Sequence, residues 1–448
     1  MAARAFEEMV GREHVLTDPD LVASYVVDWT GRYRGHSPVV VRPGSVDEVA
    51  ALVGFCAAHE VALTLQGGNT GLVGGSVPLR GEVVLSLRRL DAIGAVDDGS
   101  GQVTVGSGVT IGQLQSEVGR SGWAYGVDLA SRDSASIGGT IATNAGGLRV
   151  LCYGDTRAQV RGVEAVLGDG SVIAHLGGLL KDNTGYDLGR LLCGSEGTLG
   201  VVTSARLALV RPAAVRAVAL LAFDTVGSSV RASAALRWVH AGLEAVELFL
   251  QPGLELVCSA FGLSAPFKTV FGAYLLVEAG DCDDPTDRLG EVVASLEGVG
   301  DVALARSAPQ RAALWRYREA HTDAIARLGI AHKLDVAVPL GRLCELVERV
   351  PGVVTAAAPG ARTWLFGHAA DGNVHVNITG VAPEDESVDS AVLDLVASLD
   401  GSISAEHGIG VAKRRFLELS RSPSEIAAMR AVKAALDPAG ILNPNVLL

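Results

Sequence analysis

Hydrophobic and polar residues alternate along the stretch VHVNIT at 374–379. A period of two predicts a strand that buries one face and carries its polar side chains on the other. The preceding apolar run at 364–368 predicts a partner strand. Between them, Asp-Gly at 371–372 is the commonest dipeptide of a two-residue hairpin turn. With that turn, His368 would lie directly opposite His375.

The two histidines of this predicted hairpin are candidate metal ligands. Directly opposed side chains of an antiparallel pair have Cβ atoms about 5 Å apart, so two imidazoles there can share one ion. Glu406, further along the chain, would complete a two-His, one-carboxylate set that leaves positions open for a substrate. A pair of surface histidines without a metal is the alternative that the pattern leaves open.

A different order of elements is predicted nearer the N-terminus. Two apolar strand patterns flank a predicted helix at 45–60, with Ser45 as its N-cap and Glu48 in a capping box. The glycine-rich stretch GGNTGLVGGSVP at 67–78 follows the second strand. This order presents backbone N–H groups to a phosphate, and since no lysine follows the loop, it is not a P-loop.

Glycine is the outlier of the composition, because 30 of the 55 glycines lie between Gly67 and Gly200. That density suits close approach of the backbone to a large ligand, although a loop-rich region would also show it. The stretch at 106–112 has the spacing GxGxxxG, one residue off the dinucleotide fingerprint, which disfavours a nicotinamide site. Two further segments, 131–147 and 193–203, combine glycines with small hydroxyl and amide residues.

The strand pattern of the first half ends at Arg-Pro 211–212, and we place a domain boundary there, with domains at 1–211 and 212–448. Beyond the boundary, strand patterns alternate with helical patterns, one of which covers 225–241. This order predicts helices packed on one antiparallel sheet. The expected fold class is α+β.

Charged residues of the second half are candidates for binding a substrate. A long helical pattern at 309–328 places Arg318 and Thr322 four residues apart on one face. The strand pattern that follows puts Lys333 on the face opposite its apolar residues. An ordinary exposed charge is the alternative for Arg318 and for Lys333. Two histidines of this region are expected to be ordinary exposed groups: His321 and His332.

Composition and charge narrow the classes of function. The 448 residues suffice for two domains, or three, and 48% of them are hydrophobic. Lys and Arg number 37 against 50 Asp and Glu, a net charge of −13 without a basic block, so nucleic-acid binding is not expected.

No signal-peptide pattern occurs, and no apolar run approaches the ~18 residues that span a bilayer. We therefore expect a cytoplasmic protein that is not integral to a membrane. The six scattered cysteines predict no iron-sulfur centre.

The three segments 67–78, 131–147 and 193–203 together resemble the PCMH-type flavin-binding domain of the vanillyl-alcohol oxidase superfamily. By that resemblance the first segment holds the FAD pyrophosphate, and the other two line the ribityl chain and the isoalloxazine edge. The first loop has no histidine to carry a covalent flavin, so the resemblance implies non-covalent FAD. The implied FAD-binding residues are Gly67, Gly68, Asn69, Thr70, Gly71, Ser136, Gly138, Gly139, Thr143, Asn144, Gly197 and Val202.

The second half resembles the C-terminal domain of the FAD-dependent D-2-hydroxy acid dehydrogenases. The matching stretches are WRYREAHTD, HKLDVAVP, GHAADGNVHVN, SAEHGIG and LDPAGILNP. The resemblance implies a substrate- and metal-binding domain whose C-terminal helical segment returns to the FAD domain. By that resemblance, the metal ligands are His368, His375 and Glu406, and the catalytic base is His407. The implied substrate-binding residues are Arg318, Thr322, Lys333 and Asn377.

The implied reaction oxidises a D-2-hydroxy acid to the 2-oxo acid, with hydride transfer from C2 to flavin N5. A divalent cation on the hydroxyl and the C1 carboxylate would lower the pKa of the hydroxyl, and a neighbouring histidine would take its proton. Zn is the favoured ion, although the ligand set also tolerates Mn, Fe or Co. Because the metal engages C1, Arg318, Thr322 and Lys333 would hold a distal carboxylate. That favours D-2-hydroxyglutarate, converted to 2-oxoglutarate.

Several alternatives stay open at this point. D-lactate dehydrogenase and glycolate oxidase activities are the alternatives within the family, and a metal-dependent hydrolase is the rival from another class. The reduced flavin needs an electron acceptor, such as an electron-transfer flavoprotein, a quinone-linked carrier or oxygen. The oligomeric state is open, with a homodimer as one option.

Overall fold

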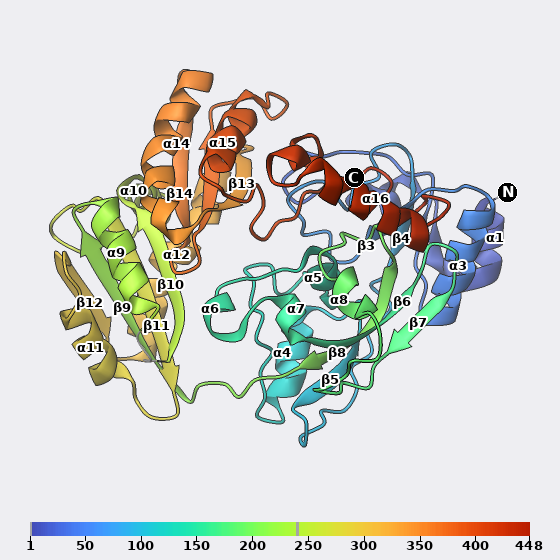
Figure 1. The fold of residues 1–448 in the computed structure, drawn as a ribbon, viewed down its shortest axis with the longest axis horizontal. Coiled ribbons are helices and arrows are strands. Elements are labelled where there is room, and N and C mark those ends of the chain that lie inside the picture. The colour runs from blue at the N-terminus through green and yellow to red at the C-terminus, as the bar shows by residue number, and fades with distance from the viewer. Residues whose placement is uncertain (1, 239–241) are drawn as a thin grey trace. The chain divides into compact units, whose positions relative to one another are not determined.

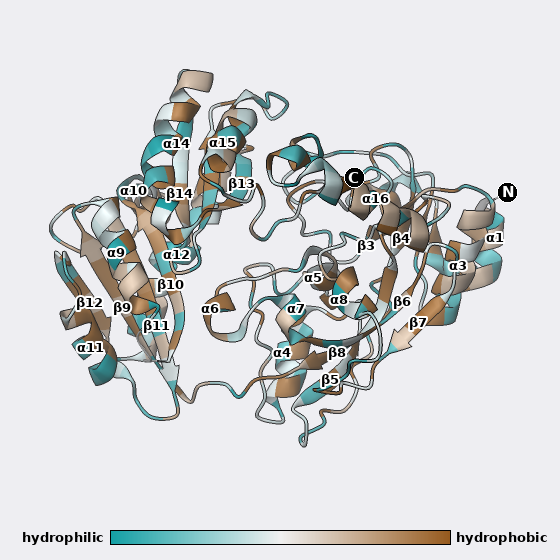
Figure 2. Cartoon of the chain, viewed as in Figure 1, coloured by the Kyte–Doolittle hydropathy of each residue, from teal (hydrophilic) through white to brown (hydrophobic). Residues whose placement is uncertain are grey.

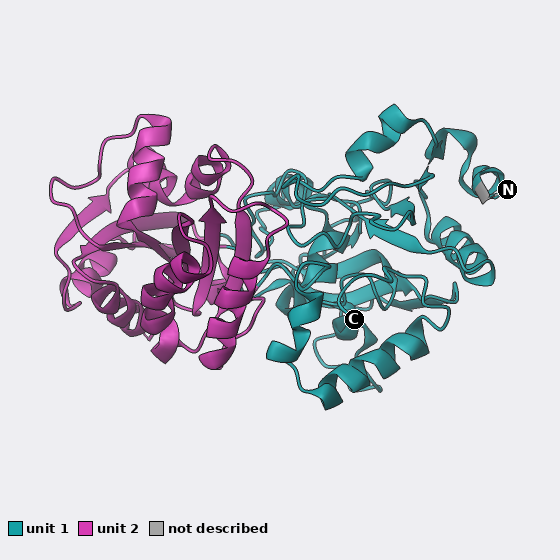
Figure 3. Cartoon of the chain, turned by 90° about the horizontal axis from the view of Figure 1, so that it is seen from above, with its two compact units in different colours: residues 1–147, 153–212, 406–448 teal, residues 148–152, 213–405 magenta. Residues whose placement is uncertain are grey.

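The structure, a computed structural model, describes residues 2–238 and 242–448 (Figure 1). The chain forms two compact units, coloured separately in Figure 3. Unit 1 consists of Met1–Gly147, Tyr153–Pro212 and Glu406–Leu448, and unit 2 of Leu148–Cys152 and Ala213–Ala405. Separate helices and antiparallel strands dominate both units, which confirms the expected α+β class. Among the described residues, no helix has the length and apolar character needed to cross a bilayer.

The first sheet of unit 1 has the strand order β1-β2-β4-β3, and its β2-β4 and β3-β4 pairs are parallel. Parallel strands need a crossover connection, and helix α3 supplies it between β2 and β3. Ser45 caps α3 as expected, since its hydroxyl accepts the Glu48 N–H at 3.2 Å. The Glu48 carboxylate accepts the N–H of Gly44 instead of that of Ser45, so the expected capping box is displaced by one residue. The elements here are β1 (Val15–Leu16), β2 (Val40–Val41), α3 (Val46–Ala58), β3 (Leu63–Gln66) and β4 (Val83–Ser86).

The second sheet of unit 1 is antiparallel throughout, with the order β5-β8-β6-β7. Its strands are β5 (Gln102–Gly106), β6 (Val160–Val166), β7 (Val172–His175) and β8 (Val201–Ala208). Fully buried residues of α4 and α5, such as Leu114 and Ile141, share a core with Val103 and Ala205 of the sheet. The other α-helices of unit 1 are α1 (Ala2–Val10), α2 (Pro19–Val22), α4 (Ile111–Gly119), α5 (Ile137–Thr143), α7 (Thr156–Gln159), α8 (Leu188–Leu192) and α16 (Pro423–Leu436), while most of α6 (Val150–Tyr153) belongs to unit 2.

Unit 2 is built on one seven-stranded antiparallel sheet with the order β12-β9-β11-β10-β14-β15-β13. Figure 2 shows hydrophobic residues along strands such as β9, whose residues from Ala217 to Phe223 are buried. Helices α10, α12 and α13 pack on one face around Phe249 and Phe366, while α14 contacts both α9 and α15. The strands are β9 (Val215–Phe223), β10 (Leu243–Leu250), β11 (Ala273–Asp281), β12 (Asp301–Ala305), β13 (His332–Ala337), β14 (Arg362–His368) and β15 (Asn373–Thr379). The helices are α9 (Val226–Leu236), α10 (Gln251–Phe261), α11 (Thr286–Ala294), α12 (Ala308–Glu319), α13 (His321–Ala326), α14 (Leu343–Ala357) and α15 (Ser387–Ser398).

Two expected helices differ from the structure. The helix expected at 225–241 is α9, which ends at Leu236, and residues 239–241 lie outside the described part of the chain. The single long helix expected at 309–328 is wrong, because the chain breaks at Ala320 between α12 and α13. The side chain of His321 turns back to the Arg318 carbonyl, 3.1 Å from its Nδ1, and is buried. That contact lies at the break between the two helices.

The register of the β14-β15 hairpin also differs from the expectation. His368 pairs with Asn373 and Phe366 pairs with His375, so the two histidines are not directly opposed. The four residues of the turn are held by other partners: the Ala369 N–H donates to the Val246 carbonyl (2.9 Å), and the Ala370 carbonyl accepts from Arg237 (3.1 Å). The expected pairing of residues 370 and 373 is thus displaced by two positions. Because side chains alternate with a period of two, this shift keeps both histidines on one face as diagonal neighbours.

Candidate active site

The loop after β3 offers an uninterrupted row of backbone donors. Within the described residues, none of the five N–H groups from Gly67 to Gly71 donates a hydrogen bond to the protein. Asn69 lies in the left-handed region at φ 56°, and its side chain is tied to the Val27 carbonyl (2.9 Å) and to the Ser76 hydroxyl (2.8 Å). Successive N–H groups in such a conformation form an anion-binding nest. The loop therefore fits the pyrophosphate of FAD.

Close packing joins this loop to the second glycine segment. A Cβ on Gly67 would collide with the hydroxyl of Ser136, and one on Gly138 would lie 2.7 Å from the Cβ of Ser107. Ser136 is the N-cap of α5, and its hydroxyl accepts the Gly139 N–H at 3.3 Å. Glycine fits at these two positions because a Cβ at either would meet a serine side chain. The helix contains Gly138, Gly139 and Thr143, and Asn144 ends it in the left-handed region at φ 52°.

The third glycine segment connects the flavin segments to the C-terminal stretch of unit 1. Glu196 donates its N–H to the Ala142 carbonyl (2.7 Å), and its buried carboxylate accepts the N–H groups of Ile409 (2.8 Å) and Gly410 (2.7 Å). Burial raises the pKa of this carboxyl above its usual value, against the effect of the two N–H donors. Gly197 follows it in the turn before β8, which carries Val202. The loop that begins with Glu406 and His407 is thus fastened to the segment expected to contact the flavin.

Glu406 has a partner in the second glycine segment. Its Oε1 accepts the Gly147 N–H at 2.8 Å. The residue before it, Ala405, is the last of unit 2, and its N–H donates to the Asp335 carbonyl at 3.2 Å. Glu406 and His407 therefore stand where the chain passes from the large sheet to the flavin-type unit.

In unit 2, each candidate histidine ligand lies directly opposite a carboxylate on the next strand. Glu247 of β10 pairs with His368 of β14, and Asp335 of β13 pairs with His375 of β15. These four strands are neighbours in the order β10-β14-β15-β13. Since paired residues of antiparallel strands share a face, the four side chains form one row, acid, histidine, histidine, acid. We call them the acid–histidine row.

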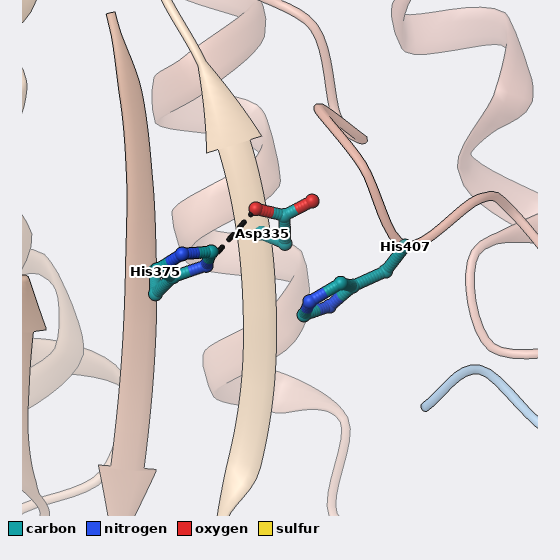
Figure 4. A group of neighbouring side chains, drawn as sticks. All are labelled: Asp335, His375 and His407. Atoms are coloured by element: carbon teal, nitrogen blue, oxygen red, sulfur yellow. Dashed lines mark ion pairs between the residues drawn. The ribbon is translucent and has the colours of Figure 1, made fainter. Parts of the chain in front are cut away.

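The contacts within the row define the protonation of both rings. The Nδ1 of His368 lies 2.6 Å from Glu247 Oε1, and the Nδ1 of His375 lies 3.1 Å from Asp335 Oδ1, the ion pair drawn in Figure 4. A carboxylate only accepts, so each Nδ1 carries a proton, and Nε2 is the ring atom through which each histidine could bind a metal. The two ring centroids are 5.3 Å apart. Histidines oriented in this way by carboxylates are typical metal ligands, so the pair fits a divalent ion.

Arg318 is not the exposed charge that the sequence left open. Its side chain is 7% exposed, and its Nη2 lies 2.7 Å from Glu247 Oε2. The guanidinium also stacks over Phe366, with its central carbon 4.5 Å from the ring centroid. The Nε atom is buried and has no hydrogen-bond partner within the described residues. A buried donor of this kind is satisfied by an incoming acceptor, such as a substrate carboxylate.

Glu247 is the carboxylate that serves both sides of this cluster. It is 1% exposed. Burial raises the pKa of Glu247, but its neighbours His368 and Arg318 outweigh that effect and hold the pKa below its usual value. The carboxyl is therefore an anion that accepts a hydrogen bond from His368 at Oε1 and forms an ion pair with Arg318 at Oε2.

The other candidate substrate residues lie next to the row. Lys333 of β13 pairs directly with Asn377 of β15, which is buried, and burial lowers the pKa of the Lys333 ammonium. Thr322 lies in α13, beyond the break at Ala320, and is half-buried. Its hydroxyl makes no side-chain hydrogen bond among the residues that the structure describes. The structure thus brings Arg318, Lys333 and Asn377 to one sheet face and leaves Thr322 on the adjoining helix.

Sequence reasoning assigned no role to three polar residues of this site. Glu247 stands inside the apolar strand pattern LEAVELFL, and an acidic residue in such a run is the signal that could have identified it. Asp335 stands beside Lys333 in its strand, and Asn373 donates to Asp335 Oδ1 at 2.8 Å. His321 and His332, expected to be exposed, are buried, and the Nδ1 of His332 lies 2.6 Å from Asp389.

Family comparisons match most of the chain. Residues 37–175 match the family described as FAD binding domain, and residues 212–447 match FAD linked oxidases, C-terminal domain. The chain is 38% identical to a D-2-hydroxyglutarate dehydrogenase of Xanthomonas citri pv. viticola, over 99% of this chain and 96% of that protein. It is also 38% identical to the mitochondrial D-2-hydroxyglutarate dehydrogenase of Bos taurus, over 98% of this chain and 82% of that protein.

Solved structures share the fold. One is p-cresol methylhydroxylase with substrate bound, at a TM-score of 0.80 and 18% identity over 99% of this chain and 95% of that chain. Another is alkyldihydroxyacetonephosphate synthase, at a TM-score of 0.77 and 16% identity over 99% and 84%. These two likenesses concern the fold alone.

A pH-dependent stability is expected from His321. Burial and the Arg318 charge lower the pKa of His321 to about 3, whereas an unfolded histidine titrates near 6.5. Below pH ~6.5 this histidine is protonated in the unfolded chain but stays neutral in the folded chain. Its contribution to the free energy of unfolding is therefore complete above that pH and is lost on acidification. His321→Gln should make the fall of the unfolding free energy between pH 6 and 5 shallower by up to about 1.4 kcal/mol per pH unit. Urea titrations at each pH measure the slope, and equal slopes for parent and variant would contradict the buried neutral ring.

Proposed function

The chain belongs to the FAD-linked oxidase family, and on that premise we propose that it oxidises D-2-hydroxyglutarate to 2-oxoglutarate with FAD and a divalent metal ion. Its standing as an FAD-dependent oxidoreductase follows from the family and from full-length relatives named D-2-hydroxyglutarate dehydrogenase. The observation that carries the substrate proposal is the buried Arg318 beside the acid–histidine row, with an unsatisfied Nε. A hydrolase, the rival left open by the sequence, is set aside because the chain is a flavoprotein oxidoreductase.

Each group of residues has a defined task in this proposal. When bound, FAD supplies the hydride acceptor and the metal ion supplies a Lewis acid for the substrate hydroxyl. The nest from Gly67 to Gly71 would hold the pyrophosphate, and small residues of the other two flavin segments would line the remainder of the cofactor. The Nε2 atoms of His368 and His375, with the carboxylate of Glu406, would hold the metal, for which Zn is proposed.

The chain's own residues move the proton and hold the substrate. His407 takes the proton of the C2 hydroxyl on its imidazole, a group suited to general-base catalysis. Arg318 and Lys333 bind the carboxylate at the far end of a dicarboxylate substrate, with Thr322 from α13 and Asn377 from β15 as further contacts. A guanidinium held by Glu247 on one side is preorganised to receive a carboxylate on the other.

Two monocarboxylates are the alternative substrates, D-lactate and glycolate. Neither has a second carboxylate to satisfy the Arg318 Nε, so both would leave that buried donor without a partner. The electron acceptor is proposed to be a separate carrier, such as an electron-transfer flavoprotein or a quinone-linked protein.

Anaerobic mixing with a panel of hydroxy acids tests the function. Purified protein with FAD and Zn should show bleaching of the flavin absorbance with D-2-hydroxyglutarate. The rate should be slower with D-lactate and glycolate, and negligible with L-2-hydroxyglutarate. Treatment with a chelator should slow the reduction, and added Zn should restore it. Failure of every D-2-hydroxy acid to bleach the flavin would refute the proposed activity.

Lys333→Ala tests the distal carboxylate. A hydrogen bond to a charged group contributes about 1.5–3 kcal/mol, so kcat/KM for D-2-hydroxyglutarate should fall about ten- to a hundredfold more than that for D-lactate. Lys268, an exposed lysine of the same unit, provides the matched control, and Lys268→Ala should change neither value. Equal losses on both substrates in Lys333→Ala would remove the assignment of the distal carboxylate.

His407→Ala tests the base. The variant should keep the flavin spectrum and bind Zn, but its rate of flavin reduction by D-2-hydroxyglutarate should fall by about 10²- to 10⁴-fold, the usual contribution of a general base. His175→Ala, which replaces an exposed histidine of unit 1, should reduce at the parent rate. A normal reduction rate in His407→Ala would show that another group takes the proton.

A further inference from the structure

One buried carboxylate is shared by two parts of the site that come from different elements. Glu247 projects from β10 and places its two oxygens on two partners, Oε1 at 2.6 Å from the Nδ1 of His368 and Oε2 at 2.7 Å from the Nη2 of Arg318. His368 is on β14 and Arg318 is on α12. The carboxylate therefore links a candidate metal ligand to a candidate substrate ligand.

The location of Glu247 makes this link rigid. It pairs directly with His368 in the sheet, and its neighbours in the strand, Val246 and Leu248, are each 2% exposed. A buried anion is costly unless donors surround it, and here both donors come from the site.

We propose that Glu247 is a positioning residue that orients the metal ligand His368 and the substrate clamp Arg318 at the same time, so that the affinities for metal and for substrate carboxylate are coupled through it. The inference rests on the proposed function, because it assigns Glu247 to the same site. It adds a residue that touches neither substrate nor metal. The charge on Oε2 holds Nη2 of Arg318, and Nε of the same guanidinium is a buried donor without a hydrogen-bond partner among the described residues. The acceptor at Oε1 fixes the proton on Nδ1 of His368, which leaves Nε2 for the metal.

Asp335 provides a matched comparison within the same row. It is 0% exposed and lies opposite His375, 3.1 Å from its Nδ1, in the same arrangement as Glu247 and His368. Its Oδ1 also accepts from the Asn373 amide at 2.8 Å, whereas Glu247 engages a guanidinium. Asp335 therefore orients a histidine in the same way, while its Oδ1 is shared with an amide and Glu247 instead forms an ion pair with Arg318 through Oε2. Removing its charge should affect metal binding and spare the clamp.

The experiment compares Glu247→Gln with Asp335→Asn in the FAD-loaded chain. After removal of metal, Zn²⁺ affinity is measured by competition with a chromogenic chelator, in the absence of substrate. Loss of a carboxylate that orients a ligating histidine weakens metal affinity about 10- to 100-fold, and both variants should show this loss. At saturating Zn²⁺, KM for D-2-hydroxyglutarate should rise about tenfold in Glu247→Gln and stay within about twofold of the parent in Asp335→Asn. The flavin spectrum should be unchanged in both.

A second pair of variants tests the coupling even if Glu247→Gln does not fold. Arg318→Gln removes the partner of Glu247 without altering a histidine, and it should weaken Zn²⁺ affinity several-fold. Lys268→Ala, which removes an exposed cation of the same unit, should leave Zn²⁺ affinity at the parent value. Unchanged Zn²⁺ affinity in Arg318→Gln, or equal KM changes in Glu247→Gln and Asp335→Asn, would overturn the shared positioning role. A parent protein that binds no Zn²⁺ and is not reduced by D-2-hydroxy acids would instead refute the proposed function.

Discussion

The antiparallel register of four neighbouring strands, β10, β14, β15 and β13, is the constraint on which the polar face of unit 2 depends. Paired residues of antiparallel strands lie on the same side of a sheet, so each histidine receives a carboxylate from the adjacent strand. A one-residue slip of β10 or β13 would turn its carboxylate to the opposite face. The acid–histidine row therefore exists only in this register, and it is supported by strands and not by loops.

This arrangement buries charged carboxylates, and their pairing with nearby donors offsets the free-energy cost of that burial. An unpaired carboxylate removed from water costs several kcal/mol. Glu247 faces His368 and Arg318, while Asp335 faces His375 and Asn373. Next to the row the same face becomes aromatic, with Phe366 lying 5.1 Å from both the His375 and the His321 rings, centroid to centroid. The apolar part keeps His321 neutral and gives the Arg318 guanidinium a flat surface to stack on.

In unit 1 the candidate binding groups are backbone N–H groups, whereas in unit 2 they are side chains. The loop from Gly67 to Gly71 offers consecutive N–H groups, and glycines let the loop and α5 approach closely. Glu196, which is buried, holds the loop that follows His407 through two backbone N–H groups. The segment that contains Glu406 and His407 is thereby part of the flavin-type unit, although it comes last in the chain.

Local patterns in the sequence were sufficient for the α+β class, for the hairpin strands and for the glycine segments of the family. The period of two placed His375 and Asn377 on one face, and an error of two residues in the expected hairpin register left His368 on that face too. The break at Ala320, the burial of His321 and the pairing of Glu247 with His368 and Arg318 were not accessible in this way. A strand's own alternation determines which face a side chain takes, because that depends only on the residues beside it. Which strands become neighbours, and which helix lies over them, is decided by packing between positions far apart in the chain, and only the tertiary structure contains it.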